Sequence, residues 1–76
     1  MPIHAYMFVE TSVEPGEFVR AARQLEGVVH AHALFGPLDA IVHVEAPDMD
    51  ALERVVTSIH YVPGLKSGDT RIARSV

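Results

Sequence analysis

The chain has 76 residues, enough for one domain with a modest hydrophobic core, and 49% of them are hydrophobic. Six basic and ten acidic side chains give a formal charge of −4, and the scattered basic residues argue against direct binding to DNA or RNA; without cysteine, disulfides and thiolate metal sites are excluded. The sequence shows neither a signal-peptide pattern nor an apolar run of membrane-spanning length, so we expect a cytoplasmic protein with no membrane partner.

The first predicted elements are a strand and a helix. Ile3 to Thr11 is nearly all apolar or aromatic on both alternating faces, which predicts a strand in a covered sheet. Pro15 suits the first turn of a helix, because its missing N–H would have no partner there. Apolar residues then recur at helical spacing as far as Leu25, and we expect Gly27 to end this helix.

Next in the chain comes a predicted β-hairpin. Apolar and β-branched runs between Val28 and Ala46 flank the turn Gly36-Pro37-Leu38-Asp39, called the 36–39 turn below. Glycine allows a positive φ at the start of this turn. The carboxylate that ends it has two open roles: accepting from backbone N–H groups of the turn, or accepting from the ammonium of a ligand.

A second helix and a last strand complete the chain. Asp48 can accept hydrogen bonds from the free N–H groups of a first helical turn. An apolar stripe follows at helical spacing, and Pro63 and Gly64 are expected to end the helix. Residues 65–75 predict a strand whose several charged side chains suit the edge of a sheet.

The order of the predicted elements is β-α-β-β-α-β. Two interleaved split β-α-β units form the ferredoxin-like sandwich, an α+β fold with a four-stranded antiparallel sheet and both helices on one face. We expect residues 1–76 to be this single domain. The helices leave the other face of the sheet uncovered. Apolar residues predicted on both faces therefore favour dimerisation through the sheet.

Several segments together resemble the ligand-binding RAM domain of the Lrp/AsnC transcription regulators. They are Ala-Tyr-Met-Phe-Val at residues 5–9, Glu-Pro-Gly at 14–16, Leu-Glu-Gly-Val at 25–28, the 36–39 turn, Ala-Ile-Val-His-Val-Glu at 40–45 and Ile-His-Tyr-Val-Pro-Gly-Leu at 59–65. The resemblance covers essentially the whole chain. It implies a dimeric α/β barrel, often joined into a larger ring such as an octamer, with a small effector, usually an amino acid, bound between dimers.

The resemblance also implies where the effector binds. Gly36 and Asp39 match a Gly-x-x-Asp motif of the family, and Pro37 and Leu38 lie between them. Thr70 matches one member of a Thr-x-Thr pair in the last strand, and we expect a neighbouring subunit to supply it. The sequence departs from the family pattern at two places: Leu38 stands where an aromatic residue is frequent, and the first threonine position is glycine. The wall facing the turn is therefore altered.

Family regulators carry an N-terminal helix-turn-helix for DNA, whereas this chain starts at the first strand, as in stand-alone RAM proteins. We therefore expect a non-enzymatic effector-binding and oligomerisation module without a DNA-binding domain, forming a homodimer and a higher ring. Its expected partners are a small amino acid or related metabolite and a full-length Lrp-type regulator. No direct contact with nucleic acid is expected.

The histidines leave other interpretations open. His30 and His32 lie two apart, hence on one face of a strand, and His43 can approach them across the hairpin. Three imidazoles can make a zinc site. They can also form a pH-sensitive interface, because imidazole titrates near neutrality. We predict no metal site, because no carboxylate is placed to orient such ligands.

A small cofactorless enzyme of the same dimeric barrel type, a monooxygenase or isomerase, is the alternative function. His4 and Tyr6 would join the three hairpin histidines in an enclosed cavity of each protomer. The sequence contains no Gly-x-Ser-x-Gly, P-loop or Gly-x-Gly-x-x-Gly motif, so we predict no catalytic residues and no cofactor. A structural oligomer without a ligand is the third possibility.

Overall fold

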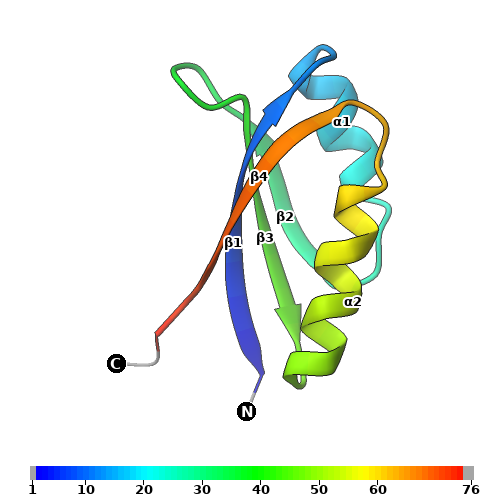
Figure 1. Cartoon of the computed structure of the whole chain (residues 1–76), viewed down its shortest axis with the longest axis vertical. Coiled ribbons are helices and arrows are strands. Elements are labelled where there is room, and N and C mark those ends of the chain that lie inside the picture. Colours follow the sequence, from blue (N-terminus) through cyan, green and yellow to red (C-terminus); the bar gives the residue numbers. More distant parts are fainter. Residues whose placement is uncertain (1, 75–76) are drawn as a thin grey trace.

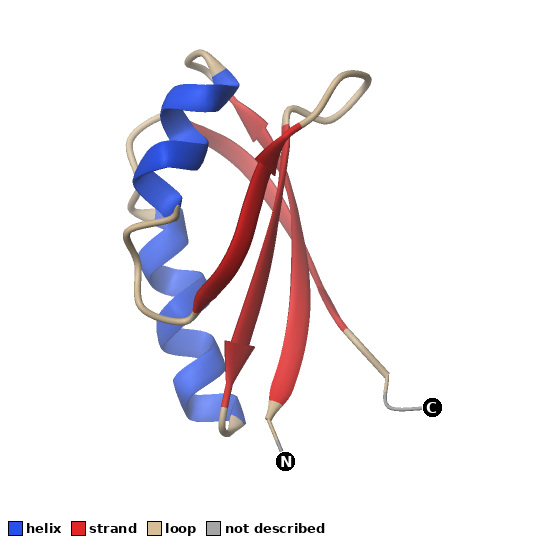
Figure 2. Cartoon of the chain, turned by 180° about the vertical axis from the view of Figure 1, so that it is seen from behind, coloured by secondary structure: helices blue, strands red, loops and turns tan. Residues whose placement is uncertain are grey.

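The computed structural model describes residues 2–74 and has the predicted order of elements (Figure 1). These elements are β1 (Ile3–Thr11), α1 (Pro15–Ala22), β2 (Val28–Ala33), β3 (Ala40–Ala46), α2 (Met49–His60) and β4 (Leu65–Ile72). The strands form one antiparallel sheet in the order β2-β3-β1-β4. Figure 2 shows both helices on one side of this sheet. The predicted ferredoxin-like fold is confirmed.

Both helices start where the sequence predicts; capping by Asp48 was expected, whereas capping by Glu14 is found only in the structure. The Glu14 side chain accepts a hydrogen bond from the Glu17 N–H at 3.2 Å, and proline occupies the first turn of α1. Asp48 accepts from the Ala51 N–H at 2.8 Å at the start of α2. Within residues 2–74, neither helix is long and apolar enough to cross a membrane.

The end of α1 was predicted wrongly. The helix ends at Ala22, and the Leu25 N–H donates to the Ala22 carbonyl in a tighter turn three residues long. Gly27, at φ +94°, closes this turn, and a Cβ there would lie 2.5 Å from a methyl group of Val55. Gly27 is therefore needed where the chain passes under α2, several residues beyond the helix.

Both edges of the sheet are exposed strands. The charged strand β4 is one edge, as predicted, but it ends at Ile72; the Ser75 end of the predicted strand lies outside the described residues. An exposed ion pair between Arg71 and Asp69, with 2.9 Å between nitrogen and oxygen, marks this edge. The other edge is β2, which carries no such charges.

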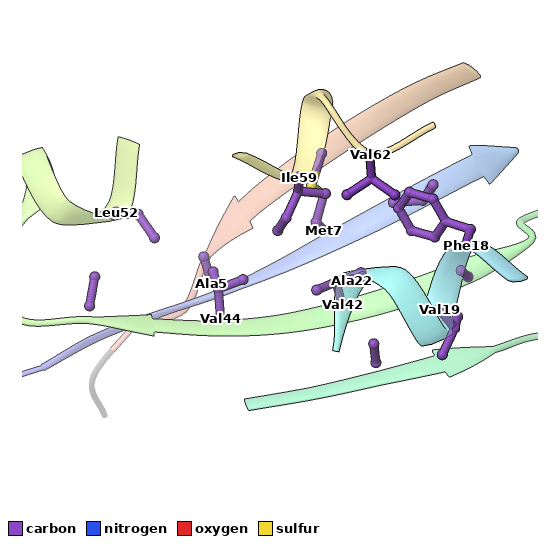
Figure 3. Close-up of a cluster of buried hydrophobic side chains, with 14 residues drawn as sticks. Ala5, Met7, Phe18, Val19, Ala22, Val42, Val44, Leu52, Ile59 and Val62 are labelled. Atoms are coloured by element: carbon purple, nitrogen blue, oxygen red, sulfur yellow. The ribbon is translucent and has the colours of Figure 1, made fainter. Parts of the chain in front are cut away.

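The core lies between the helices and the sheet. Figure 3 shows side chains from α1, α2 and the central strands meeting in one cluster. Phe18, Met7 and Ile59 are the largest fully buried side chains. Within residues 2–74, every buried side chain is hydrophobic, so the space between helices and sheet is filled by apolar packing.

Candidate functional site

The β2–β3 connection is longer than the predicted four-residue turn and runs from residue 34 to residue 39. Its base is closed by the Leu34 N–H, which donates to the Asp39 carbonyl at 2.8 Å. Gly36 has φ +119°, and apart from Gly36 itself and its two chain neighbours, no residue has an atom within 4 Å of the position of a Cβ. The backbone conformation, and not lack of space, therefore requires glycine here. Phe35 beside it is fully exposed, so the tip of the connection is free to meet a ligand or another chain.

Asp39 anchors this connection to the first strand. Its Oδ2 accepts from the Thr11 N–H at 2.8 Å, and its own N–H donates to the Val9 carbonyl at 2.9 Å. The register between β1 and β4 shifts at this place, between Glu10 and Thr11. The carboxylate therefore bonds a backbone N–H, as one of its two predicted roles required, but the donor comes from β1 and not from the turn.

Thr70 does not join the 36–39 turn within one chain. It lies opposite Met7 in the β1–β4 pairing, and Met7 is buried under the helices. Paired residues point to the same side of a sheet, so Thr70 faces the helix side. The structure thus gathers Gly36, Pro37, Leu38 and Asp39 in one connection, in which Gly36 and Pro37 are exposed and Leu38 and Asp39 are half-buried, and leaves Thr70 on the far edge strand.

The uncovered face of the sheet carries a cluster of imidazole and phenol rings, called the histidine face below. The His4 Nδ1 lies 3.0 Å from the His43 Nε2. Tyr6 stacks on His43 with ring centroids 4.7 Å apart, and His30 lies 6.0 Å from both His43 and His32. A hollow of about 260 Å³ on this face is lined by Tyr6, His30, His32, Ile41 and His43. The hairpin histidines therefore meet, as predicted, and β1 adds two more rings.

Protonation of His43 is unfavourable in the folded chain. Desolvation lowers the pKa of His43 below its ordinary value of 6.5, and the nearby His4 and His30 lower it further, while Glu45 opposes them. A 3.0 Å contact between two ring nitrogens also requires a neutral ring, since one N–H must point at the lone pair of the other. At least one of the His4 and His43 rings is therefore neutral.

The geometry bears on two of the alternative interpretations of these histidines, the zinc site and the enzyme cavity. Among residues 2–74, no three His, Asp or Glu side chains are placed to hold a metal ion. The five polar residues of the enzyme alternative all lie on the uncovered face, whereas the interior between helices and sheet is apolar. The enclosed polar cavity that this alternative needs is therefore not formed between the helices and the sheet.

Sequence reasoning did not find the partner of Asp39. Thr11 is 28 residues away in the chain, and only the pairing of β1 with β3 brings its N–H to the carboxylate. The exposure of Phe35 was also missed, because apolar residues beside a turn are expected to pack against the hairpin. No local pattern in the sequence signals either feature.

Comparison with known proteins shows the family of the chain and solved structures with the same fold. The chain matches the sequence profile of the Lrp/AsnC ligand binding domain over residues 5–76. No protein of curated function matches its sequence. Among solved structures, a hypothetical protein from Pyrococcus horikoshii is 24% identical with a TM-score of 0.86, covering 97% of this chain and 92% of that one.

Two solved regulators are similar to the chain over about half of their own length. AsnC from E. coli is 17% identical with a TM-score of 0.84, covering 97% of this chain and 52% of that one. A transcriptional regulator from Neisseria meningitidis, in complex with L-Met, is 18% identical with a TM-score of 0.80, covering 96% and 50%. At these identities, the structural likeness shows the shared fold.

Proposed function

The chain belongs to the Lrp/AsnC ligand-binding domain family, and on that premise we propose that it binds an amino acid or a related metabolite and couples this binding to its own assembly. The observation that carries the proposal is the 34–39 connection. Its residues 34–37 are exposed, Asp39 bonds its base to β1, and its tip contains a glycine with open space at the Cβ position. A ligand can approach the bare backbone there.

The proposed ligand contacts are Gly36, Pro37, Leu38 and Asp39 from one subunit and Thr70 from another. Asp39 uses Oδ2 for the Thr11 N–H, and Oδ1 makes no hydrogen bond to residues 2–74. This second oxygen can accept from a ligand ammonium, a charge-assisted bond. The placement of Thr70 on the opposite edge strand is compatible with its belonging to the site of a neighbouring subunit.

Assembly is proposed to begin at the histidine face. Phe8 and Ile41 pair across β1 and β3 on this side, next to the stacked rings of Tyr6 and His43. A surface of this composition is typical of the core of an interface. Two sheets packed face to face would make a dimer, and the 34–39 connections would then be free to join dimers into a ring. A full-length Lrp-type regulator is the proposed protein partner of this assembly.

The mechanism is thermodynamic coupling. A ligand that contacts two subunits binds the assembled state more tightly than the separate dimers, and it shifts the equilibrium by that difference in affinity. A bound regulator would sense the change in assembly. The formal charge of −4 gives no support to direct contact of this chain with DNA.

Thermal denaturation with each standard amino acid tests the proposed site. Asp39→Asn keeps an oxygen that can accept from the Thr11 N–H but removes the negative charge. We expect at least one amino acid to raise the Tm of the wild-type protein, and Asp39→Asn to weaken its binding at least about tenfold, ~1.4 kcal/mol.

Asp50→Asn is the matched control, because it removes the same charge from the first turn of α2, away from the connection. Its affinity should equal that of the wild type. If no amino acid or related metabolite raises the Tm of the wild-type protein, or if both variants bind equally well, the proposed site is wrong.

A further inference from the structure

We propose that Arg23 guards the exposed edge of β2 against pairing with the same strand of a second copy of the chain. The edge itself is the first observation. β2 ends the sheet, and its sequence Val-Val-His-Ala-His-Ala contains no Lys, Arg, Asp or Glu. The opposite edge, β4, carries Lys66, Asp69 and Arg71. Charged side chains and covered backbone groups are the usual protection of such edges, and β2 lacks the first of them.

The second observation is the direction of the backbone groups in β2. Ala31 lies opposite Val42, and its carbonyl points away from β3, because it accepts from a side chain outside the sheet. Antiparallel pairing alternates, so the N–H and carbonyl of Ala33 also point outward. The inward hydrogen bond from the Leu34 N–H to the Asp39 carbonyl agrees with this alternation.

These outward groups are self-complementary. Two copies of β2 related by a twofold axis through His32 would place Ala31 opposite Ala33 of the second copy, twice. Each such pair can exchange two N–H···O bonds. The edge is therefore suited to pairing with another copy of itself, and the Ala31 carbonyl is a required acceptor in that pairing.

Arg23 occupies this acceptor. Its Nε lies 3.0 Å and its Nη2 lies 2.7 Å from the Ala31 carbonyl oxygen, a two-pronged, charge-assisted contact. The guanidinium is held there because Arg23 caps α1, where its own N–H donates to the Val19 carbonyl at 3.0 Å. Pairing of two β2 edges would break both contacts and would bring two positive charges together, so the edge stays closed.

This role is distinct from that of the neighbouring arginine. Arg20 lies in the last turn of the same helix, with a terminal nitrogen 3.6 Å from the Cβ position of Gly16, and it makes no hydrogen bond to β2. The two arginines have the same charge, and both are exposed. They therefore provide a matched pair of variants.

Sedimentation of Arg23→Met and Arg20→Met over a range of protein concentration tests the proposal. Methionine keeps a long unbranched side chain and removes every donor. We expect Arg23→Met to form assemblies at least twice the mass of the wild-type particle, increasingly so as concentration rises. Arg20→Met should keep the wild-type mass. Adding Ala33→Lys, which places a charge on the open edge, should return Arg23→Met to the wild-type mass.

Two results would overturn the proposal: Arg23→Met that is folded by circular dichroism and has the wild-type mass, or larger assemblies that Ala33→Lys does not reduce. A merely structural role for Arg23 predicts the first of these. If Arg23→Met does not fold, Arg23→Lys keeps the charge but has one donor nitrogen in place of two, and it must show a partial increase in mass. No ligand is needed, so the outcome is independent of the proposed effector site.

Discussion

At the scale of single residues, His43 makes stability depend on pH. The folded pKa of His43 is lowered, first by desolvation and then by His4 and His30. Below pH 6.5 the unfolded chain therefore binds more protons at this residue than the folded chain does. The contribution of His43 to the free energy of unfolding falls as the pH drops through this range, and it becomes constant below the folded pKa.

Urea denaturation at pH 7 and pH 5 measures this dependence. We expect wild-type protein to lose more stability between the two pH values than His43→Gln, whose amide does not titrate. His60→Gln, which removes an exposed histidine at the end of α2, is the control and should lose as much as the wild type. Equal losses in His43→Gln and wild-type protein would show that His43 does not supply the dependence.

Residue roles could be predicted only where the partner is close in the chain. Asp48 caps the N–H three residues later, and its role was read from the sequence. The carboxylate of Asp39 has its partner across the sheet, at Thr11, so both its roles stayed open until the register was known. For the same reason, nothing in the sequence separates Arg23 from Arg20, whose contacts differ only in the folded chain.

At the scale of the elements, starts were predicted better than ends. Proline and the capping carboxylates act locally, and both helix starts follow them. The end of α1 at Ala22 was missed, because the residues after it keep an apolar spacing while forming a tighter turn. That turn depends on the passage of Gly27 beneath Val55, a contact between elements far apart in sequence.

Two glycine variants test whether the contact of Gly27 with Val55 adds to the requirement for a positive φ. Gly27→Ala adds backbone strain at a positive φ and a clash with Val55, whereas Gly36→Ala adds strain alone. We expect Gly36→Ala to lower the free energy of unfolding by about 1–3 kcal/mol and Gly27→Ala to lower it by at least ~1 kcal/mol more. Urea denaturation measures both. Equal losses would mean that the chain relaxes away from Val55 without cost.

At the scale of the whole molecule, the fold followed from the order and periodicity of the elements. The composition of the uncovered face did not. Ala5, Met7 and Val9 lie under the helices, and strand alternation puts His4 and Tyr6 on the other side of the sheet. The sequence alone does not decide which of these two alternating sets of residues faces the helices. The expected apolar patch is thus a surface of imidazole and aromatic rings. Its apolar and aromatic area suits an interface.

The two surfaces have different expected roles in assembly. The histidine face is proposed to pair copies of the chain, while the β2 edge is closed by Arg23. A closed edge limits association to faces and connections, which can form a particle of defined size. An open edge would allow growth in a further direction. A ligand can control assembly only if the β2 edge is closed and the particle has a defined size.

The central claim is that effector binding and assembly are one equilibrium, and the mass of the particle with and without ligand tests it most directly. Sedimentation velocity should show that the amino acid or related metabolite that raises the Tm of the wild-type protein also changes its mass. The same ligand concentration should leave the mass of Asp39→Asn unchanged. A ligand that binds at the 34–39 connection with no change in mass at any protein concentration would contradict the claim.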